Sequence, residues 1–228
     1  MKRDGEKIVA VVVYDYQLAQ IVDRAGVDIV SVGDSVGVNM WGREREGDVT
    51  VDEMLLACKA VRRGVTRAIV SCDIPSSSTD LLAAARRLVG EGGAEMVKVE
   101  ASAGSIRSIV EEGIPVWAQL AKPDASVENL VHEATLLQSA GASLIDFRHS
   151  GPVAGPAVTA AVSIPVIGGL GGGPWLDGRV RAIVNAIGYT AAALDDVGDR
   201  YANVARVGFE AITAYTADVR AGRQIRGK

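Results

Sequence analysis

The chain has 228 residues, of which 48% are hydrophobic and 23% charged, and its formal net charge is -4. This length and composition allow one sizeable core and exclude a disordered or fibrous chain. The scattered basic residues argue against a nucleic-acid partner, and two cysteines without CxxC spacing, Cys58 and Cys72, argue against a disulfide framework or a zinc site. We therefore expect a small molecule as the partner.

The first apolar run of the chain is too short to cross a membrane. The start MKRDGEK leads through IVAVVVY directly to Asp15, without a small-residue cleavage site. We expect a cytoplasmic enzyme with no membrane partner.

Strand-like and helix-like segments alternate along the chain, which is typical of a parallel sheet with helical crossovers. Several helix-like segments follow an Asp, Ser or Thr that can cap a helix. The expected strands lie near residues 7–14, 28–33, 67–73, 96–100, 115–120, 144–149 and 165–169, with an eighth near Arg179–Val184. The expected helices lie near 16–25, 52–63, 78–91, 103–112, 126–140 and 153–162, and an amphipathic tail follows at about 196–221.

Eight strand–helix units predict a (β/α)8 TIM-type barrel, a single domain over residues 1–228, although a doubly wound sheet has the same local pattern. The positions of the polar residues favour the barrel, because an open sheet would concentrate them at one switch point. Those at or just beyond strand ends are Asp15, Asp34, Asp73, Glu100, Gln119 and His149.

Three carboxylates stand where hydrophobic runs stop: Asp34 in DIVSVGD, Asp73 in AIVSCD and Glu100 in MVKVE. Strand ends of a barrel can present such hard oxygen ligands to one divalent cation. Each acid could instead cap the helix that follows its strand, but three in one ordered pattern favour a metal site. Lys98 precedes Glu100 by two residues and faces the same side of its strand.

Five segments in order resemble the ketopantoate hydroxymethyltransferase family. They are VVVYDYQLAQIVDRAGVDIVSVGDSVGV, TVDEMLLACKAVRRG, CDIPSS, EGGAEMVKVEAS and IPVIGGLGGGPWLDGR. That family belongs to the phosphoenolpyruvate mutase and isocitrate lyase superfamily of barrels, whose members bind magnesium and handle enolates of 2-oxo acids. The resemblance implies Mg²⁺ as cofactor, a 2-oxo acid or related carboxylate as substrate, and a homo-oligomer.

The resemblance also implies roles for individual residues. Asp34, Asp73 and Glu100 correspond to the metal-site acids, and Ser35 and Lys98 are expected to contact the substrate. Magnesium prefers six oxygen ligands and needs few protein carboxylates when a 2-oxo acid supplies two oxygens. A cation placed there would stabilise negative charge during enolate formation.

Three departures from the family pattern accompany these matches. Arg148, in LIDFRHSG, stands where the family has its catalytic glutamate, and a guanidinium binds anions but accepts no proton in turnover. Gln119 stands where the family has a histidine. The family's glycine-rich loop after that segment is missing, and a helix is expected almost at once after Pro123.

A replacement for the missing base is left open by the sequence. His149 has a suitable pKa range but points away from Arg148 on a regular strand. Asp146 shares a face with Arg148 but would lie deeper, either as a base or as an interior ion partner of Arg148. Other candidates are Lys122, Tyr14 and Asp15. The candidate catalytic residues are thus Arg148, His149 and Lys98, and the candidate substrate contacts are Ser35, Asp34, Asp73, Lys98 and Gln119.

Two loops could also border the site. Gly168–Pro174 reads GGLGGGP, which favours a tight turn near the substrate over a phosphate loop because no GK[ST] follows. The charged stretch from Trp41 to Asp48 could close over the pocket or could be a solvated connection.

Three functions follow as hypotheses. The first is magnesium-dependent formation or cleavage of a carbon–carbon bond beside a 2-oxo acid, with Arg148 recognising an additional anionic group. The second is the family's own hydroxymethyl transfer from methylenetetrahydrofolate with a relocated base. The third is a barrel that binds a ligand or partner without turnover.

Overall fold

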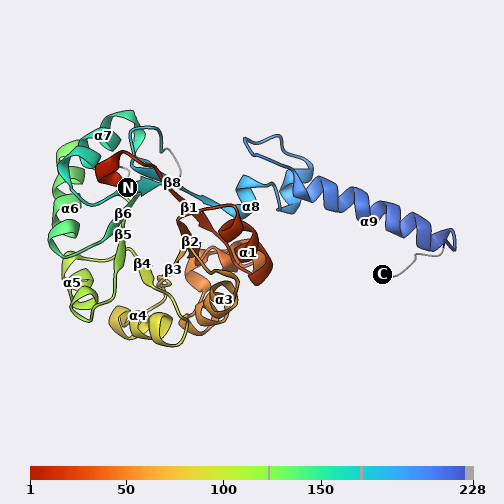
Figure 1. Cartoon of the computed structure of the whole chain (residues 1–228), viewed down its shortest axis with the longest axis horizontal. Helices are drawn as coiled ribbons and strands as arrows, with labels where there is room; N and C mark the ends of the chain where they lie inside the picture. The colour runs from red at the N-terminus through yellow and green to blue at the C-terminus, as the bar shows by residue number, and fades with distance from the viewer. Residues whose placement is uncertain (123, 170–171, 224–228) are drawn as a thin grey trace. The chain divides into compact units, whose positions relative to one another are not determined.

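The computed structural model describes residues 1–122, 124–169 and 172–223. Parallel strands β1 to β8 close into a barrel in chain order (Figure 1), which confirms the predicted (β/α)8 fold and excludes the open doubly wound sheet. Every strand overlaps its predicted run. The bounds are β1 (Ile8–Val12), β2 (Ile29–Val32), β3 (Ile69–Asp73), β4 (Met96–Val99), β5 (Val116–Leu120), β6 (Leu144–Phe147), β7 (Val166–Gly168) and β8 (Gly178–Ala182).

Helices surround the ring of strands (Figure 1) and also follow the prediction. They are α1 (Tyr16–Arg24), α3 (Val51–Gly64), α4 (Leu81–Gly90), α5 (Ala103–Glu111), α6 (Val127–Ser139) and α7 (Gly151–Ala161). Several helices begin after an Asp, Ser or Thr, as expected: the side chains of Asp15, Thr50, Asp80, Ser102 and Ser126 accept hydrogen bonds from the first turns of α1, α3, α4, α5 and α6.

Two short elements between β2 and α3 were not predicted. Helix α2 (Val36–Trp41) follows β2 and ends at Gly42, whose φ of 68° lies in the left-handed region that favours glycine. The 3₁₀ turn η2 (Glu46–Asp48) then leads into α3. Helix α2 ends where the charged stretch Trp41–Asp48 begins, and η2 lies within that stretch, which the sequence predicted either to close over the pocket or to be a solvated connection.

The interior of the barrel is filled by apolar side chains. One buried cluster takes residues from seven of the strands: Ile8, Ala10, Ile29, Met96, Trp117, Leu144, Ile167 and Val180. Trp117 is the largest of these and is fully buried. A packed interior leaves the carboxyl ends of the strands as the place for a cavity.

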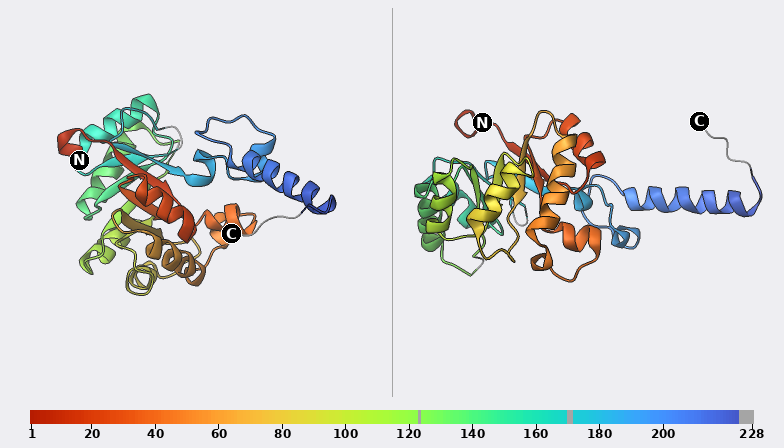
Figure 2. Two further views of the ribbon diagram at one scale, coloured as in Figure 1. Left: turned by 45° about the vertical axis from the view of Figure 1, so that its right-hand side comes forward. Right: turned by 90° about the horizontal axis from the view of Figure 1, so that it is seen from below.

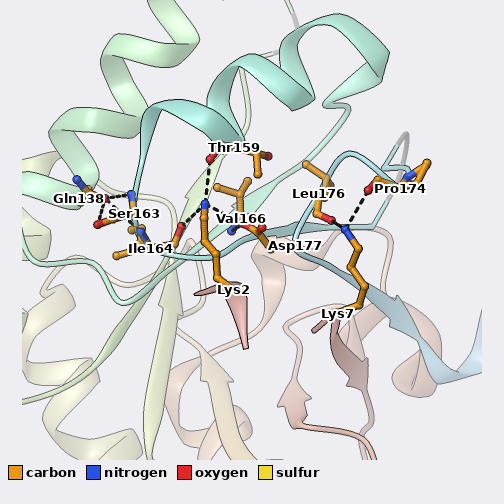
Figure 3. Close-up of polar contacts among 10 residues, drawn as sticks. All are labelled: Lys2, Lys7, Gln138, Thr159, Ser163, Ile164, Val166, Pro174, Leu176 and Asp177. Atoms are coloured by element: carbon orange, nitrogen blue, oxygen red, sulfur yellow. Dashed lines mark hydrogen bonds and ion pairs between the residues drawn. The ribbon is translucent and has the colours of Figure 1, made fainter. Parts of the chain in front are cut away.

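The segment before β1 is held at the amino-terminal end of the barrel, where β7 and β8 also begin (Figure 3). Lys2 Nζ donates hydrogen bonds to the carbonyl oxygens of Thr159 at 2.9 Å and Ile164 at 3.0 Å, and it lies 3.0 Å from Asp177 Oδ2. The same Asp177 oxygen accepts a hydrogen bond from the Val166 N–H at 2.8 Å. Figures 1 and 2 accordingly show the N-terminal turn η1 (Lys2–Asp4) beside α7. These contacts stabilise the end of the barrel that is remote from the cavity.

The chain divides into two compact units, residues 1–181 and residues 182–228. The second contains α8 (Ile183–Ala186), the 3₁₀ turn η3 (Ala191–Leu194) and α9 (Val204–Arg220), which runs as one unbroken helix (Figure 2). Helix α9 lies within the predicted tail. That all 228 residues form one domain stays a prediction. No helix in the described ranges has both the length and the apolar character needed to span a bilayer.

Candidate active site

A cavity of about 640 Å³ opens at the carboxyl ends of the barrel strands. This is the end at which barrel enzymes carry their active sites. Asp34 follows β2, Asp73 ends β3, and Lys98 and Glu100 come from β4 and its end. The full wall consists of Asp34, Glu46, Gly47, Asp73, Ile74, Pro75, Ser76, Ser78, Thr79, Leu81, Lys98, Val99, Glu100, Gln119 and Arg148. The structure therefore brings six of the eight predicted site residues into one cavity.

Asp34 and Asp73 form the acidic side of this cavity. A Cβ on Gly33 would lie only 2.8 Å from Val12 Cγ1, so glycine allows the end of β2 to pass close to β1, and the same position is in ordinary contact distance of Asp73 Oδ2 at 3.8 Å. Burial raises the pKa of Asp34, and the negative charge of Glu46 raises it further. Burial also raises the pKa of Asp73 to about 6; the charge of Lys98 opposes this and that of Asp34 adds to it.

Lys98 is buried between two carboxylates. Its Nζ lies 3.4 Å from Asp73 Oδ2 and 3.4 Å from Asp146 Oδ2, and 5.4 Å from the centre of the Trp117 ring. Burial by itself lowers the pKa of Lys98, but the charges of Asp73 and Asp146 outweigh it and the pKa is raised. The ammonium group therefore stays charged at the floor of the cavity.

Arg148 lines the cavity directly above Asp146. Its Nε lies 3.8 Å from Asp146 Oδ2, and its side chain is 37% exposed whereas that of Asp146 is 2% exposed. This confirms the interpretation of Asp146 as a deeper, interior ion partner of Arg148. Asp146 faces both Lys98 and Arg148, and within the described residues no other carboxylate pairs with Arg148, so its guanidinium has donors that can bind an anion in the cavity.

Exposed Glu100 and half-buried Gln119 form one edge of the same cavity. Gln119 Nε2 donates a hydrogen bond of 3.2 Å to Glu100 Oε2. Both predicted residues are thus near the substrate space, and Glu100 as a metal ligand stays a prediction.

Two predicted residues lie outside the cavity wall as far as the chain is described. Ser35 is hydrogen-bonded to the Tyr14 hydroxyl at 2.9 Å, and Asn39 Nδ2 donates to the same hydroxyl at 3.0 Å. His149 is exposed and has a φ of 56°, because the chain leaves β6 and turns before α7. The regular strand that the sequence predicted through residue 149 ends at Phe147, and the cavity does not include His149.

The remaining candidates for the base are engaged elsewhere. Lys122 forms an ion pair with Glu133 at 3.0 Å. Asp15 caps α1 by accepting a hydrogen bond from the Leu18 N–H. Burial raises the pKa of the Tyr14 hydroxyl, which is held by Ser35 and Asn39. Pro123, Leu170 and Gly171 lie outside the described residues, so the predictions for the loops around them are not addressed.

Sequence reasoning missed Glu46 and Gly47 as cavity residues. The stretch from Trp41 to Asp48 was expected either to close over the pocket or to be solvated, and the structure places part of it in the cavity wall. A cap signal was available, because Thr50 and Glu53 form a capping box that fixes where α3 begins. The residues before Thr50 must then return to the barrel end.

The acidic side of the cavity suits a magnesium ion in one respect. Asp73 Oδ1 is buried and, among the described residues, accepts no hydrogen bond, so it has a free lone pair beside Asp34. Within the same residues no three His, Cys, Asp or Glu side chains form a ready metal-binding cluster. Magnesium commonly uses one or two carboxylates and takes its other ligands from water and substrate. Asp34 and Asp73 fit that use.

The fold and the cavity define a TIM barrel whose acidic and cationic side chains meet at the carboxyl ends of its strands. The ketopantoate hydroxymethyltransferase family matches residues 1–224. The chain belongs to this family.

Relatives named 3-methyl-2-oxobutanoate hydroxymethyltransferase agree with that assignment. The protein of Geobacter sulfurreducens is 36% identical over 246 residues, which cover 97% of this chain and 92% of the relative. That of Prosthecochloris aestuarii is 34% identical over 250 residues, which cover 97% and 90%.

Solved structures share the fold at low sequence identity. A 2,3-dimethylmalate lyase of the PEP mutase/isocitrate lyase superfamily has a TM-score of 0.68 at 15% identity, with 84% of this chain and 80% of that chain covered. Phosphonopyruvate hydrolase in complex with oxalate and Mg²⁺ has a TM-score of 0.65 at 13% identity, with 97% and 85% covered. These neighbours support the barrel assignment.

Proposed function

We propose that this protein is a Mg²⁺-dependent enzyme that forms or cleaves a carbon–carbon bond beside a 2-oxo acid through an enolate. The observation that carries the proposal is the pairing of Asp73 with Lys98 at the cavity floor, with a free Asp73 oxygen beside Asp34. This arrangement offers oxygen ligands and a fixed positive charge within one small space.

Each side chain has a separate task in this proposal. Asp34 and Asp73 hold magnesium, which when bound supplies Lewis-acid stabilisation of developing negative charge. Lys98, held between its two carboxylates, orients the substrate carboxylate. Arg148 recognises an additional anionic group, such as a second carboxylate, because its guanidinium faces the cavity.

A second candidate is the family's own reaction, hydroxymethyl transfer from methylenetetrahydrofolate to 3-methyl-2-oxobutanoate. The identity of 36% to the Geobacter sulfurreducens relative over nearly the whole chain favours it. It requires a proton acceptor other than residue 148. A non-catalytic barrel is the third possibility. Cytoplasmic localisation and a homo-oligomer stay predictions.

Proton exchange at C3 of a 2-oxo acid tests the proposal. The protein is incubated in deuterated water with Mg²⁺ and either 3-methyl-2-oxobutanoate or 2-oxoglutarate, and loss of the C3 proton signal is followed by NMR. We expect exchange that stops with EDTA and falls at least about 100-fold in Asp73→Asn, since enolate stabilisation depends on the metal site. Binding of both acids without any exchange would support the non-catalytic alternative and overturn the proposal.

A further inference from the structure

Four carboxylates line the cavity, and the proposed function leaves two of them, Glu46 and Glu100, without a task. Glu46 begins η2, in the connection between α2 and α3, and is exposed at the cavity wall. Its negative charge acts on both Asp34 and Tyr14, raising the pKa of each in addition to the effect of burial. The Glu46 carboxylate is therefore near the acidic side of the site.

Neighbouring contacts hold the segment around Glu46 at the cavity. Arg43 pairs with Glu53 at the start of α3, and Ser77 Oγ donates a hydrogen bond of 2.6 Å to the Val49 carbonyl. A Cβ on Gly47 would lie 3.1 Å from Ser76 Oγ, so η2 packs closely on the connection that follows β3. Both connections belong to the cavity wall, and Glu46 is presented to the cavity by them.

The other acids near the cavity have partners. Asp73 and Asp146 both face Lys98, and Glu100 accepts a hydrogen bond from Gln119. By contrast, the Glu46 carboxylate takes part in no hydrogen bond or ion pair with a side chain of the described residues. Asp34 is needed for the metal in the proposed function. Asp73 is paired with Lys98 through one oxygen, whereas no side chain of the described residues engages either oxygen of Glu46, so both can take part in proton transfer.

The position of Glu46 complements the arginine at residue 148. Arg148 follows β6, whereas Glu46 belongs to the connection between β2 and β3. In a closed ring of eight strands, β2 and β6 are four positions apart. Glu46 therefore borders the cavity on the side of β2, and Arg148 borders it on the side of β6.

We propose that Glu46 is the proton acceptor for the 2-oxo acid, an inference that rests on the proposed function. The C3–H bond breaks, its electron pair becomes the C2–C3 double bond of the enolate, and the proton passes to the Glu46 carboxylate. The resulting carboxylic acid can return a proton to C3, which gives exchange with solvent. A carboxylate is a competent general base when it is within hydrogen-bond reach of the carbon acid in the bound complex.

Glu46→Gln tests this role, and Glu44→Gln is a matched control. Glu44 is exposed in the same connection, two residues earlier, and is absent from the cavity wall among the described residues. We expect Glu46→Gln to slow C3 exchange of the 2-oxo acid that the wild type exchanges by roughly 100- to 10,000-fold. The thermal shift that Mg²⁺ and oxalate produce should stay at its wild-type value, and Glu44→Gln should match the wild type in both measurements.

The outcomes separate this inference from the proposed function. Wild-type exchange in Glu46→Gln would overturn the role of Glu46 and leave the proposed function standing. Loss of the oxalate shift together with exchange would show that Glu46 acts in binding, which also overturns it. If the wild type exchanges no 2-oxo acid, the proposed function fails and the inference fails with it.

Discussion

Arg148 combines a fixed position with an open binding face. Asp146 anchors its Nε side, and the rest of the guanidinium borders the cavity. Arg148→Gln removes the charge and should weaken binding of 2-oxoglutarate by about 10- to 100-fold, the effect of losing a charge-assisted hydrogen bond. Binding of 3-methyl-2-oxobutanoate should change little, because it has no second carboxylate. Calorimetric titration with Mg²⁺ present measures both affinities.

The exposed Arg107→Gln on α5 is the control for a general loss of positive charge. Equal weakening of both ligands by Arg148→Gln would contradict a role in recognising the second carboxylate. Arg148→Glu distinguishes the second candidate function, since restored or increased hydroxymethyl transfer would show that the chain retains the family's specificity.

At the level of single residues, the sequence predicts which acids stand at strand ends, but not which side chains they contact in the folded protein. Asp34 and Asp73 follow from the rule that strands end at the cavity. The position of Glu46 depends on how α2 and η2 turn the chain back, and periodicity contains no such information. His149 was misplaced because β6 ends two residues earlier than expected and the backbone turns at a positive φ.

Asp23 joins two elements of the barrel, α1 and the turn before β3. Its carboxylate accepts hydrogen bonds from the backbone N–H groups of Thr66, Arg67 and Ala68 and from the Thr66 hydroxyl. Burial alone would raise the pKa of Asp23, but these bonds lower it to about 2 from 3.8. The folded state therefore favours the ionised carboxylate.

This shift predicts a pH dependence of stability. The pKa of Asp23 is lower in the folded than in the unfolded state. Its contribution to the free energy of unfolding is therefore complete above about pH 5 and is lost as the pH falls through 3.8 towards 2. Asp23→Asn should lower the free energy of unfolding at pH 7 by about 2 kcal/mol, measured by urea denaturation. The substitution should lower the free energy of unfolding by less at pH 3 than at pH 7. An equal loss at both pH values would assign the effect to packing rather than to charge.

Among the elements, the long barrel helices were predicted closely, including α7, whose start has no side-chain cap, whereas the short helices and 3₁₀ turns were missed. Ser126 and Thr50 mark the starts of α6 and α3 in the sequence as they do in the structure. Helix α2 has six residues, and no side-chain hydrogen bond caps its start. It is too short to show a helical period.

For the whole molecule, the closed barrel could be predicted because polar residues follow most of the strands rather than one pair. The division into residues 1–181 and 182–228 could not, since an amphipathic tail fits either packing on its own barrel or an interface. In the structure α9 has no buried residue, and Val207, Phe209, Ile212, Tyr215 and Val219 are exposed. Exposed apolar side chains on one helix are typical of a surface that another chain covers.

The predicted homo-oligomer can be tested on this helix. Light scattering of the wild type should give a mass that is a multiple of 23.8 kDa. The double substitution Phe209→Asp with Ile212→Asp should lower that mass, because two charges cannot be buried in an interface without partners. Glu210→Gln, at an exposed position of the same helix, should leave it unchanged. A wild type that stays monomeric at all concentrations, or an oligomer that tolerates both aspartates, would contradict an interface on α9.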